Sequence, residues 1–232
     1  MKMGSNMKTG AALLAAACLF VPVAAAPAGG GTGAELQADT VEYNSKTGEM
    51  TATGHVVLKR DGGVAYAAFG VYNTQTKVGR LTGGVTADKE GAHLTCDVFH
   101  VLSDTQFLAE GNVHGTKEDK SFTGPQAEYF SDQEYIRMTA GGTVTTKDGS
   151  FTADYMEGWM KENRCKGVGS AHIVSPARNF EGGGDEAEYF GQESGKVILT
   201  GNAWAVQDNN TLKSQRLTVY LNETGKAEAG AP

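Results

Sequence analysis

The 232-residue chain has little proline, cysteine and tryptophan, and it has fewer basic than acidic residues. Its 5 prolines accompany 32 glycines and recurring threonine, valine, alanine and tyrosine. This composition argues against long helices and favours many short strands joined by tight turns. The 20 lysines and arginines against 27 acidic residues give a net charge of −7. That sign disfavours electrostatic, sequence-independent binding of nucleic acid.

Long hydrophobic runs are also missing, apart from one near the amino terminus. Lys2 and Lys8 precede an uncharged run at residues 10–26, and small residues follow it. This pattern predicts a cleaved secretory signal peptide at residues 1–28 and then a glycine-rich linker at residues 29–34. An uncleaved inner-membrane anchor is the alternative, although the run of 17 residues is short for a bilayer span.

The few cysteines leave their redox state open. Cys18 falls within the predicted signal peptide, so Cys96 and Cys165 remain in the rest of the chain. Both occur where small apolar residues would pack in a strand, which favours buried free thiols. Export to an oxidising compartment would also permit a disulfide, and spacing alone assigns no pair.

A repeat of about 29 residues covers the remaining chain. The run ADTVEY at residues 38–43 recurs as GDEAEY at residues 184–189, and weaker copies end at Tyr72 and Tyr129. A second signature follows the copies, namely a glycine near a small or β-branched residue, and it begins at Gly54, Gly84, Gly111, Gly142 and Gly201. The first four of these glycines are spaced by 30, 27 and 31 residues. Such periodicity is typical of stacked repeat proteins.

Apolar and polar residues alternate within each unit. In residues 50–58, Met50, Ala52, Val56 and Leu58 form the apolar set. Alternation of this kind indicates a strand with one buried apolar face and one solvent-exposed polar face. Each unit would then hold two strands and two turns, about 13 strands in all. Stacking the units predicts an all-β, solenoid-like architecture with a continuous apolar interior, because the blades of a β-propeller need roughly 40 or more residues.

The motifs at residues 36–43, the turn before Gly48 and residues 53–58 resemble the OstA-like domain, the LptA family of periplasmic lipopolysaccharide-transport bridge proteins. The resemblance covers about residues 35–222 and is weakest at residues 92–102 and 158–175. It implies an open twisted β-jelly roll at residues 35–222, followed by a flexible tail at residues 223–232. It also implies a periplasmic location.

The function implied by the resemblance is that of a carrier without catalytic activity. An apolar groove would shield the acyl chains of lipid A during transport to the outer membrane. Expected partners are lipopolysaccharide, inner-membrane and outer-membrane transport components that share the fold, and further copies of this chain. Unpaired edge strands at residues 36–43 and 212–221 would permit head-to-tail pairing. The alternative is a structural β-solenoid that assembles through these edges and binds no lipid.

Two sets of candidate binding residues follow. The lipid-contact candidates are the apolar interior residues Met50, Val56, Leu58, Phe107, Val113, Ile136, Met138, Val144, Val197 and Leu199. They could equally pack only against one another. Cations that follow the second strands would align along one rim and could contact phosphates, and these are Lys59, Lys89, Lys117, Lys147 and Arg178. Interleaved acidic residues favour the simpler interpretation of solvated turns with mixed charge.

We expect no catalytic residue, metal site or cofactor. Aspartates recur at the repeat period, which favours a turn or bulge role over acid catalysis, and they are Asp39, Asp97, Asp154 and Asp185. The five histidines show no metal-ligand spacing, and no nucleophile or phosphate-binding motif occurs. The glycines at residues 182–184 are interpreted as a connector. Trp159 and Trp204 are interpreted as edge-packing residues.

Overall fold

The computed structural model describes residues 35–60, 62–191, 195–221 and 227–229. These residues form a single antiparallel sheet of 17 strands, with a short 3-10 helix, η1 (Pro176–Arg178). The strands are β1 (Glu35–Gln37), β2 (Thr40–Asn44), β3 (Glu49–Arg60), β4 (Gly63–Asn73), β5 (Gly79–Lys89), β6 (Ala92–Val101), β7 (Gln106–Lys117), β8 (Lys120–Phe130), β9 (Tyr135–Met138), β10 (Gly142–Thr146), β11 (Gly149–Ala153), β12 (Tyr155–Trp159), β13 (Arg164–Ser175), β14 (Phe180–Phe190), β15 (Lys196–Gln207), β16 (Asn210–Tyr220) and β17 (Ala227–Ala229). The predicted all-β fold class is confirmed.

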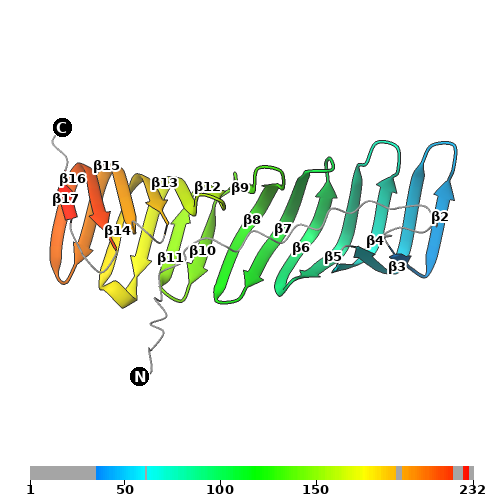
Figure 1. Cartoon of the computed structure of the whole chain (residues 1–232), viewed down its shortest axis with the longest axis horizontal. Helices are drawn as coiled ribbons and strands as arrows, with labels where there is room; N and C mark the ends of the chain where they lie inside the picture. Colours follow the sequence, from blue (N-terminus) through cyan, green and yellow to red (C-terminus); the bar gives the residue numbers. More distant parts are fainter. Residues whose placement is uncertain (1–34, 61, 192–194, 222–226, 230–232) are drawn as a thin grey trace, which may run out of the picture.

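Neighbouring strands in the sequence are neighbours in the sheet, so the molecule is an elongated stack (Figure 1). Strands β3 to β8 pair in chain order, and β13 to β16 do the same. The hairpins pile up along one axis and do not radiate around a centre. The solenoid-like stack of two-strand units predicted from the repeat is therefore confirmed.

The sheet bends along its middle into two walls. A register shift divides each long strand into two halves. Wall A contains β2, β9, β12 and the halves of the long strands on their side of the shift. Wall B contains β1, β10, β11 and the other halves. Strand β3 pairs with both β2 and β1, β8 with both β9 and β10, and β13 with both β12 and β11. We count β1 with β2, β9 with β10 and β11 with β12 as one bent strand each. On this count thirteen long strands precede β17 among the described residues, which is the number that the repeat predicts.

The bends are bulges built around glycine. In β3 the register shifts between Thr53 and Val56, and Gly54 and His55 have positive φ angles of 77° and 45°. Two successive left-handed residues turn the strand sharply, and glycine adopts this conformation without a Cβ clash. Bulges with the same pair of positive φ angles begin at Gly83, Gly111, Gly169 and Gly201. The glycine signature of the repeat thus marks the line along which walls A and B meet.

An aspartate side chain faces four of these bulges. A Cβ added to Gly54 would collide with the carboxylate of Asp39. The pairs Gly111–Asp97, Gly169–Asp154 and Gly201–Asp185 have the same geometry. Asp39 Oδ2 also lies 2.8 Å from Nδ1 of His55, the second residue of its bulge. The structural role at bulges that the sequence predicts for the recurring aspartates is confirmed.

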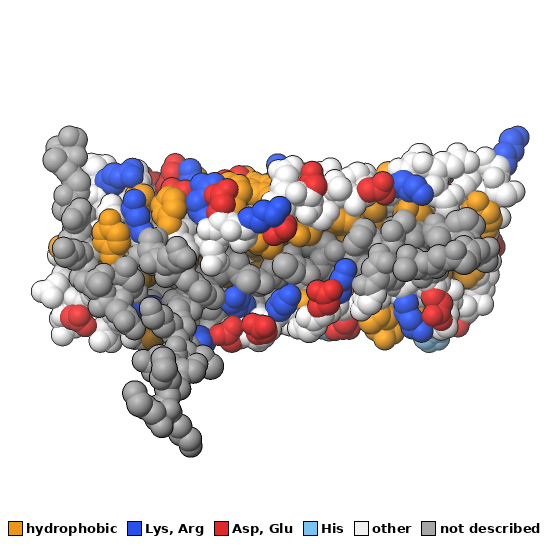
Figure 2. Space-filling model, viewed as in Figure 1, with side chains coloured by type: hydrophobic (Ala, Val, Ile, Leu, Met, Phe, Trp, Pro, Cys, Tyr) orange, Lys and Arg blue, Asp and Glu red, His pale blue; other side chains and the backbone are white. Residues whose placement is uncertain are grey.

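The two walls enclose one apolar interior. Inward-facing residues of both walls belong to the same hydrophobic cluster, for example Phe107 on wall A and Val113 on wall B. Side chains also reach across, because a Cβ on Gly167 of wall A would collide with the ring of Phe151 from wall B. Each large side chain buried in this way stabilises the fold by about 1.5–3 kcal/mol. Figure 2 shows separate patches of hydrophobic side chains along the length of this face, with charged side chains near its two margins.

The two ends of the sheet differ. At the amino-terminal end, β1 and β2 form the edge, and every residue of β2 is exposed. At the carboxy-terminal end, β17 pairs with residues 217–219 of β16, whereas residues 210–213 of β16 are exposed. Part of the predicted tail therefore forms a strand, and the second terminal edge is partly covered. The predicted signal peptide and linker lie outside the described residues.

One sequence interpretation is wrong. Residues 182–184 are not a connector but lie inside β14. Gly182 faces the interior, where a Cβ would press against Phe180 and Leu199. Gly183 faces the outside, beside the ring of Trp204. These glycines provide space for large neighbouring side chains on both faces of wall B.

Both cysteines of the described chain are free and buried, as the sequence predicts. Burial raises the pKa of the Cys96 thiol to about 12, and the negative charge of Asp97 adds to the shift. Burial also raises the pKa of Cys165. Across the described part of the chain, no helix is long and apolar enough to cross a membrane.

Candidate lipid-binding interior

The structure brings the predicted lipid-contact residues together on the inner face of the walls. Nine of the ten are buried members of the hydrophobic cluster, and Met50 is half-buried at one end of it. Their inward orientation follows from period-two alternation on each side of a bulge. In β7, for example, Phe107 and Ala109 face inward before the bulge, and Val113 does so after it. Lipid contact by these residues stays a prediction.

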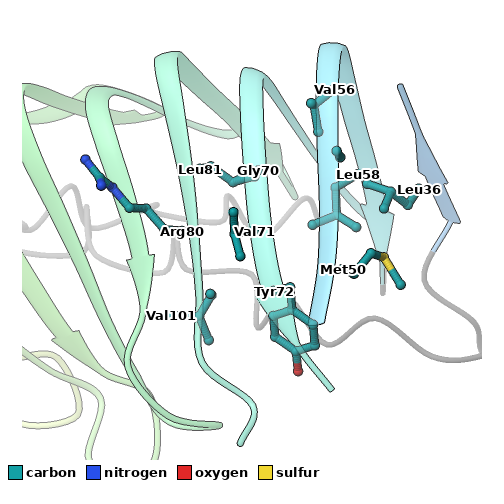
Figure 3. A pocket seen from close by; sticks show the side chains of 12 residues that line it. Leu36, Met50, Val56, Leu58, Gly70, Val71, Tyr72, Arg80, Leu81 and Val101 are labelled. Atoms are coloured by element: carbon teal, nitrogen blue, oxygen red, sulfur yellow. The ribbon is translucent and has the colours of Figure 1, made fainter. Parts of the chain in front are cut away.

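A terminal cavity lies within the interior, at the end formed by β1 and β3 to β6 (Figure 3). Its volume is about 30 Å³. Among the predicted residues, Met50, Val56 and Leu58 line it. The other lining residues are Leu36, Ala52, Gly70, Val71, Tyr72, Gly79, Arg80, Leu81 and Val101. The cavity wall is almost entirely apolar, and the space suffices for a small group but not for a whole acyl chain.

Sequence reasoning missed most of these lining residues. Leu36 and Leu81 share the inward parity of their strands, so alternation was the signal that could have identified them. Gly70 and Gly79 carry no such signal. They matter because the missing side chains leave space beside Leu81 and Tyr72, where a Cβ would collide.

The apolar inner face is exposed at both ends of the stack. Val41 and Tyr43 pair in register with the inward-facing residues Ala52 and Met50, yet they are 46% and 54% exposed. At the other end Leu212, opposite inward-facing Ala205, is 39% exposed. Among the described residues, no further strand pairs with the outer edge of β2 or with the first half of β16, so these side chains are not covered. The interior therefore continues to the two ends of the described sheet as exposed apolar surface.

The predicted cationic rim lies at one margin of the walls. Lys59, Lys89, Lys117 and Lys147 occupy the ends of β3, β5, β7 and the turn after β10. Lys59 pairs with Glu35 at 3.4 Å, and Lys147 lies 3.8 Å from Asp119. These exposed pairs contribute little to stability. Phosphate contact by the lysines stays a prediction.

Arg178 differs from the lysines of this rim. Its Nε donates a hydrogen bond of 2.6 Å to the carbonyl oxygen of Leu221, and its Nη1 lies 3.3 Å from Ser175 Oγ. The guanidinium thus joins η1 to the residue after β16. These contacts occupy N–H donors of Arg178 that could otherwise bind a phosphate.

The outer face of wall A carries an aromatic and charged cluster. The guanidinium of Arg164 lies 3.8 Å from the ring centroid of Trp159, whose ring is 5.4 Å from that of Tyr135. Tyr135 donates a hydrogen bond to Glu157. Burial and this carboxylate raise the pKa of the Tyr135 phenol. Trp159 packs within the sheet surface here.

Four histidines lie beside a carboxylate, and the pairs are His55–Asp39, His93–Asp88, His100–Glu110 and His172–Glu181. Each pair holds one imidazole and one carboxylate across neighbouring strands or at a bulge. Among the described residues, no group of three or more His, Cys, Asp or Glu side chains could hold a metal ion.

Comparison with known proteins found similarity among solved structures only. No protein-family model and no curated protein matches the chain. The chain is similar to the crystal structure of LptH, the LptA-homologous periplasmic component of the conserved lipopolysaccharide transport device from Pseudomonas aeruginosa. The sequences are 12% identical, the match covers 61% of this chain and 93% of that chain, and the TM-score is 0.34. The likeness is one of fold and does not extend to function.

Proposed function

We propose that this protein is a periplasmic carrier that binds lipopolysaccharide and shields the acyl chains of lipid A between walls A and B on the way to the outer membrane. The observation that supports this most is the single apolar interior, which runs through the stack and is exposed at its two ends. Each CH₂ group exposed to water costs about 0.8 kcal/mol, so a lipid with several acyl chains needs apolar cover at every step.

The way the walls are joined suits reversible opening. Backbone hydrogen bonds link neighbouring strands along the stack, within each wall. Contact between the walls includes apolar side chains such as Phe151 against Gly167, and also a hydrogen bond from Arg178, between the wall B parts of β13 and β14, to the carbonyl oxygen of Leu221 after the wall A part of β16. The walls can therefore separate without breaking the sheet, and an inserted acyl chain replaces the lost apolar contacts. The small terminal cavity is where such an opening would cost least packing.

The exposed ends support assembly with further copies of the chain. Val41 and Tyr43 at one end and Leu212 at the other present inner-face side chains to solvent. Pairing the β1–β2 edge of one copy with the edge that β17 and the first half of β16 form in another copy would cover them and make the interiors continuous. The two surfaces are different, so such contacts would be heterologous and could extend into a filament.

The proposal is tested with the protein and fluorescent lipopolysaccharide, followed by anisotropy. Met50→Glu places a charge in the terminal cavity, while Thr51→Glu places the same charge on the outer face of the same strand. We expect Met50→Glu to weaken binding by at least about tenfold, because a carboxylate is costly in an apolar site, and Thr51→Glu to change it less than twofold.

Competition separates the lipid from the sugar part of the ligand. Unlabelled lipid A should displace the probe, and lipopolysaccharide stripped of its acyl chains should not. Absence of binding by the folded protein, or equal effects of the two glutamates, would favour the structural β-solenoid and refute the carrier.

A further inference from the structure

A second candidate site lies outside the apolar interior, on the outer face of wall B near its carboxy-terminal end. A hollow of about 790 Å³ is formed by β15 and β16. Its lining residues are Asn202, Ala203, Trp204, Val206, Thr211, Lys213, Ser214 and Gln215. We call it the wall B hollow. Its volume falls within the range of small-molecule and cofactor sites.

The sequence of wall B places an indole ring in this hollow. Ala203 and Ala205 are buried in the interior, so Trp204 between them faces outward. In register, Trp204 lies opposite Gly183 on β14, and Gly183 lies opposite His172 on β13. Because Gly183 has no side chain, the indole extends over it, and its ring lies 5.8 Å from the ring of His172.

Polar side chains surround the indole. On the other side of Trp204, the exposed Lys213 is its register partner on β16. Thr211, Ser214 and Gln215 add hydroxyl and amide groups, each of which can donate and accept hydrogen bonds. Asn202 Nδ2 donates to Asp185 at 3.1 Å, which holds the amide in one orientation at the margin of the hollow.

We propose that the wall B hollow binds a pyranose ring of an acidic saccharide chain. The C–H groups on one face of a pyranose pack against the electron-rich face of an indole, while its hydroxyls need neighbouring groups that both donate and accept. The lining supplies both features side by side. The exposed Lys213 provides a cationic group for a carboxylate on the sugar.

The shape of the site fits a chain better than an isolated small molecule. The lining includes Thr211 and Lys213 in the exposed first half of β16, so we expect neighbouring sugar units to continue along this strand. Trp204 and its register partner Lys213 face away from the apolar interior. Saccharide binding there does not depend on lipid binding between the walls, and either can fail without the other.

Isothermal titration calorimetry of the protein with hyaluronan hexasaccharide tests the proposal, with chitohexaose as a neutral saccharide. We expect saturable binding of the hyaluronan hexasaccharide with a Kd of about 1 mM or tighter. Trp204→Ala should weaken this binding by at least about tenfold, because the stacking surface is lost. Trp159→Ala, the matched change on the outer face of wall A, should leave it unchanged.

Two exposed positions keep the test decisive if Trp204→Ala fails to fold. Lys213→Ala should weaken hyaluronan hexasaccharide binding by about three- to tenfold and leave chitohexaose binding unchanged, because only the former carries carboxylates. Gln215→Ala should weaken binding of both saccharides. No saturable heat with either saccharide at 10 mM (a deliberately high limit of about ten times the expected Kd), or full binding by Lys213→Ala and Gln215→Ala, would overturn the proposal.

Discussion

At the scale of single residues, the bend of the sheet depends on paired left-handed residues and on the space beside them. At Gly111 the position of a Cβ is taken by the carboxylate of Asp97, whose Oδ2 also accepts a hydrogen bond from Asn112 Nδ2 at 2.8 Å. A larger residue at this glycine would meet both an unfavourable φ of 74° and a collision. The cost of the positive φ can be separated from the cost of the collision, because some other glycines have a positive φ but no neighbour that a Cβ would meet.

Replacement of Gly111 by alanine should therefore destabilise the fold more than the same change at Gly84. Gly84 has a φ of 78°, and a Cβ there would meet nothing within 4 Å. We expect a loss of about 1 kcal/mol in the free energy of unfolding for Gly84→Ala and about 2–4 kcal/mol for Gly111→Ala. Urea unfolding measures both values, and equal losses would contradict the assigned role of Asp97.

The buried thiols make a second prediction at this scale. Burial raises the pKa of Cys96 to about 12 and that of Cys165 as well. A free thiol has a pKa near 8.5, so at pH 8 the unfolded chain contains reactive thiolate and the folded chain almost none. We expect negligible reaction of these two thiols with Ellman's reagent at pH 8 in the native protein and full reaction in 6 M guanidinium chloride (about the concentration that unfolds most proteins).

The sign of the pH dependence follows. Because the folded-state pKa of each thiol is raised, the contribution of these groups to stability is complete below the pKa of the unfolded thiol and declines as pH rises above it. Rapid labelling of Cys165 in the native protein at pH 8 would show that wall A opens far more readily than its packing indicates.

At the scale of elements, alternation and turn residues predicted much of the fold. Period-two patterning placed Phe107, Val113 and Leu199 correctly on the inner face, since a strand has only two faces. Alternation alone did not reveal that Gly54 and His55 form a bend, because the order of apolar and polar residues does not specify two successive positive φ angles. The terminal cavity could not be predicted from the sequence either, because it depends on how side chains from β1 and β3 to β6 pack in three dimensions.

The edge of β2 is the element on which the proposed self-association depends. Val41 is 46% exposed on the inner face of this edge, and Val78 is 45% exposed in the turn before β5. Lysine at an edge strand opposes pairing with another chain. Val41→Lys should therefore reduce self-association by about tenfold or more in sedimentation velocity, whereas Val78→Lys should not. Equal association of the two variants would place the contact elsewhere.

The cationic rim makes a further prediction at the scale of elements. Charge reversal of Lys59, Lys89 and Lys147 together should weaken lipopolysaccharide binding, because phosphates would lose attractive partners along one rim. The matched control reverses three lysines in turns at the opposite rim, and these are Lys46, Lys77 and Lys161. The two triple variants have the same net charge. Identical affinities would show that the rim acts only through overall charge, or not at all.

At the scale of the whole molecule, the proposed function rests on one sheet whose two walls pack through apolar side chains and whose described ends expose part of the inner face. Stability and ligand binding draw on the same apolar surface, since the inner residues that hold walls A and B together are also those that would contact acyl chains. A carrier of this kind needs no catalytic group, because movement of the lipid depends on affinity along a continuous path. The outer face remains available for a different ligand, as proposed for the wall B hollow.

The most direct test of this account is photo-crosslinking of lipid A from positions spread along the stack. A benzophenone amino acid replaces Tyr43, Met138 or Leu212, which face inward at the beginning, middle and end of the sheet. Outward-facing Glu42 and Arg137 serve as neighbouring controls. We predict that lipid A crosslinks to all three inward positions and to neither control. Absence of a crosslink from position 138, or equal yields from the inward and outward positions, would contradict a continuous lipid path between the walls.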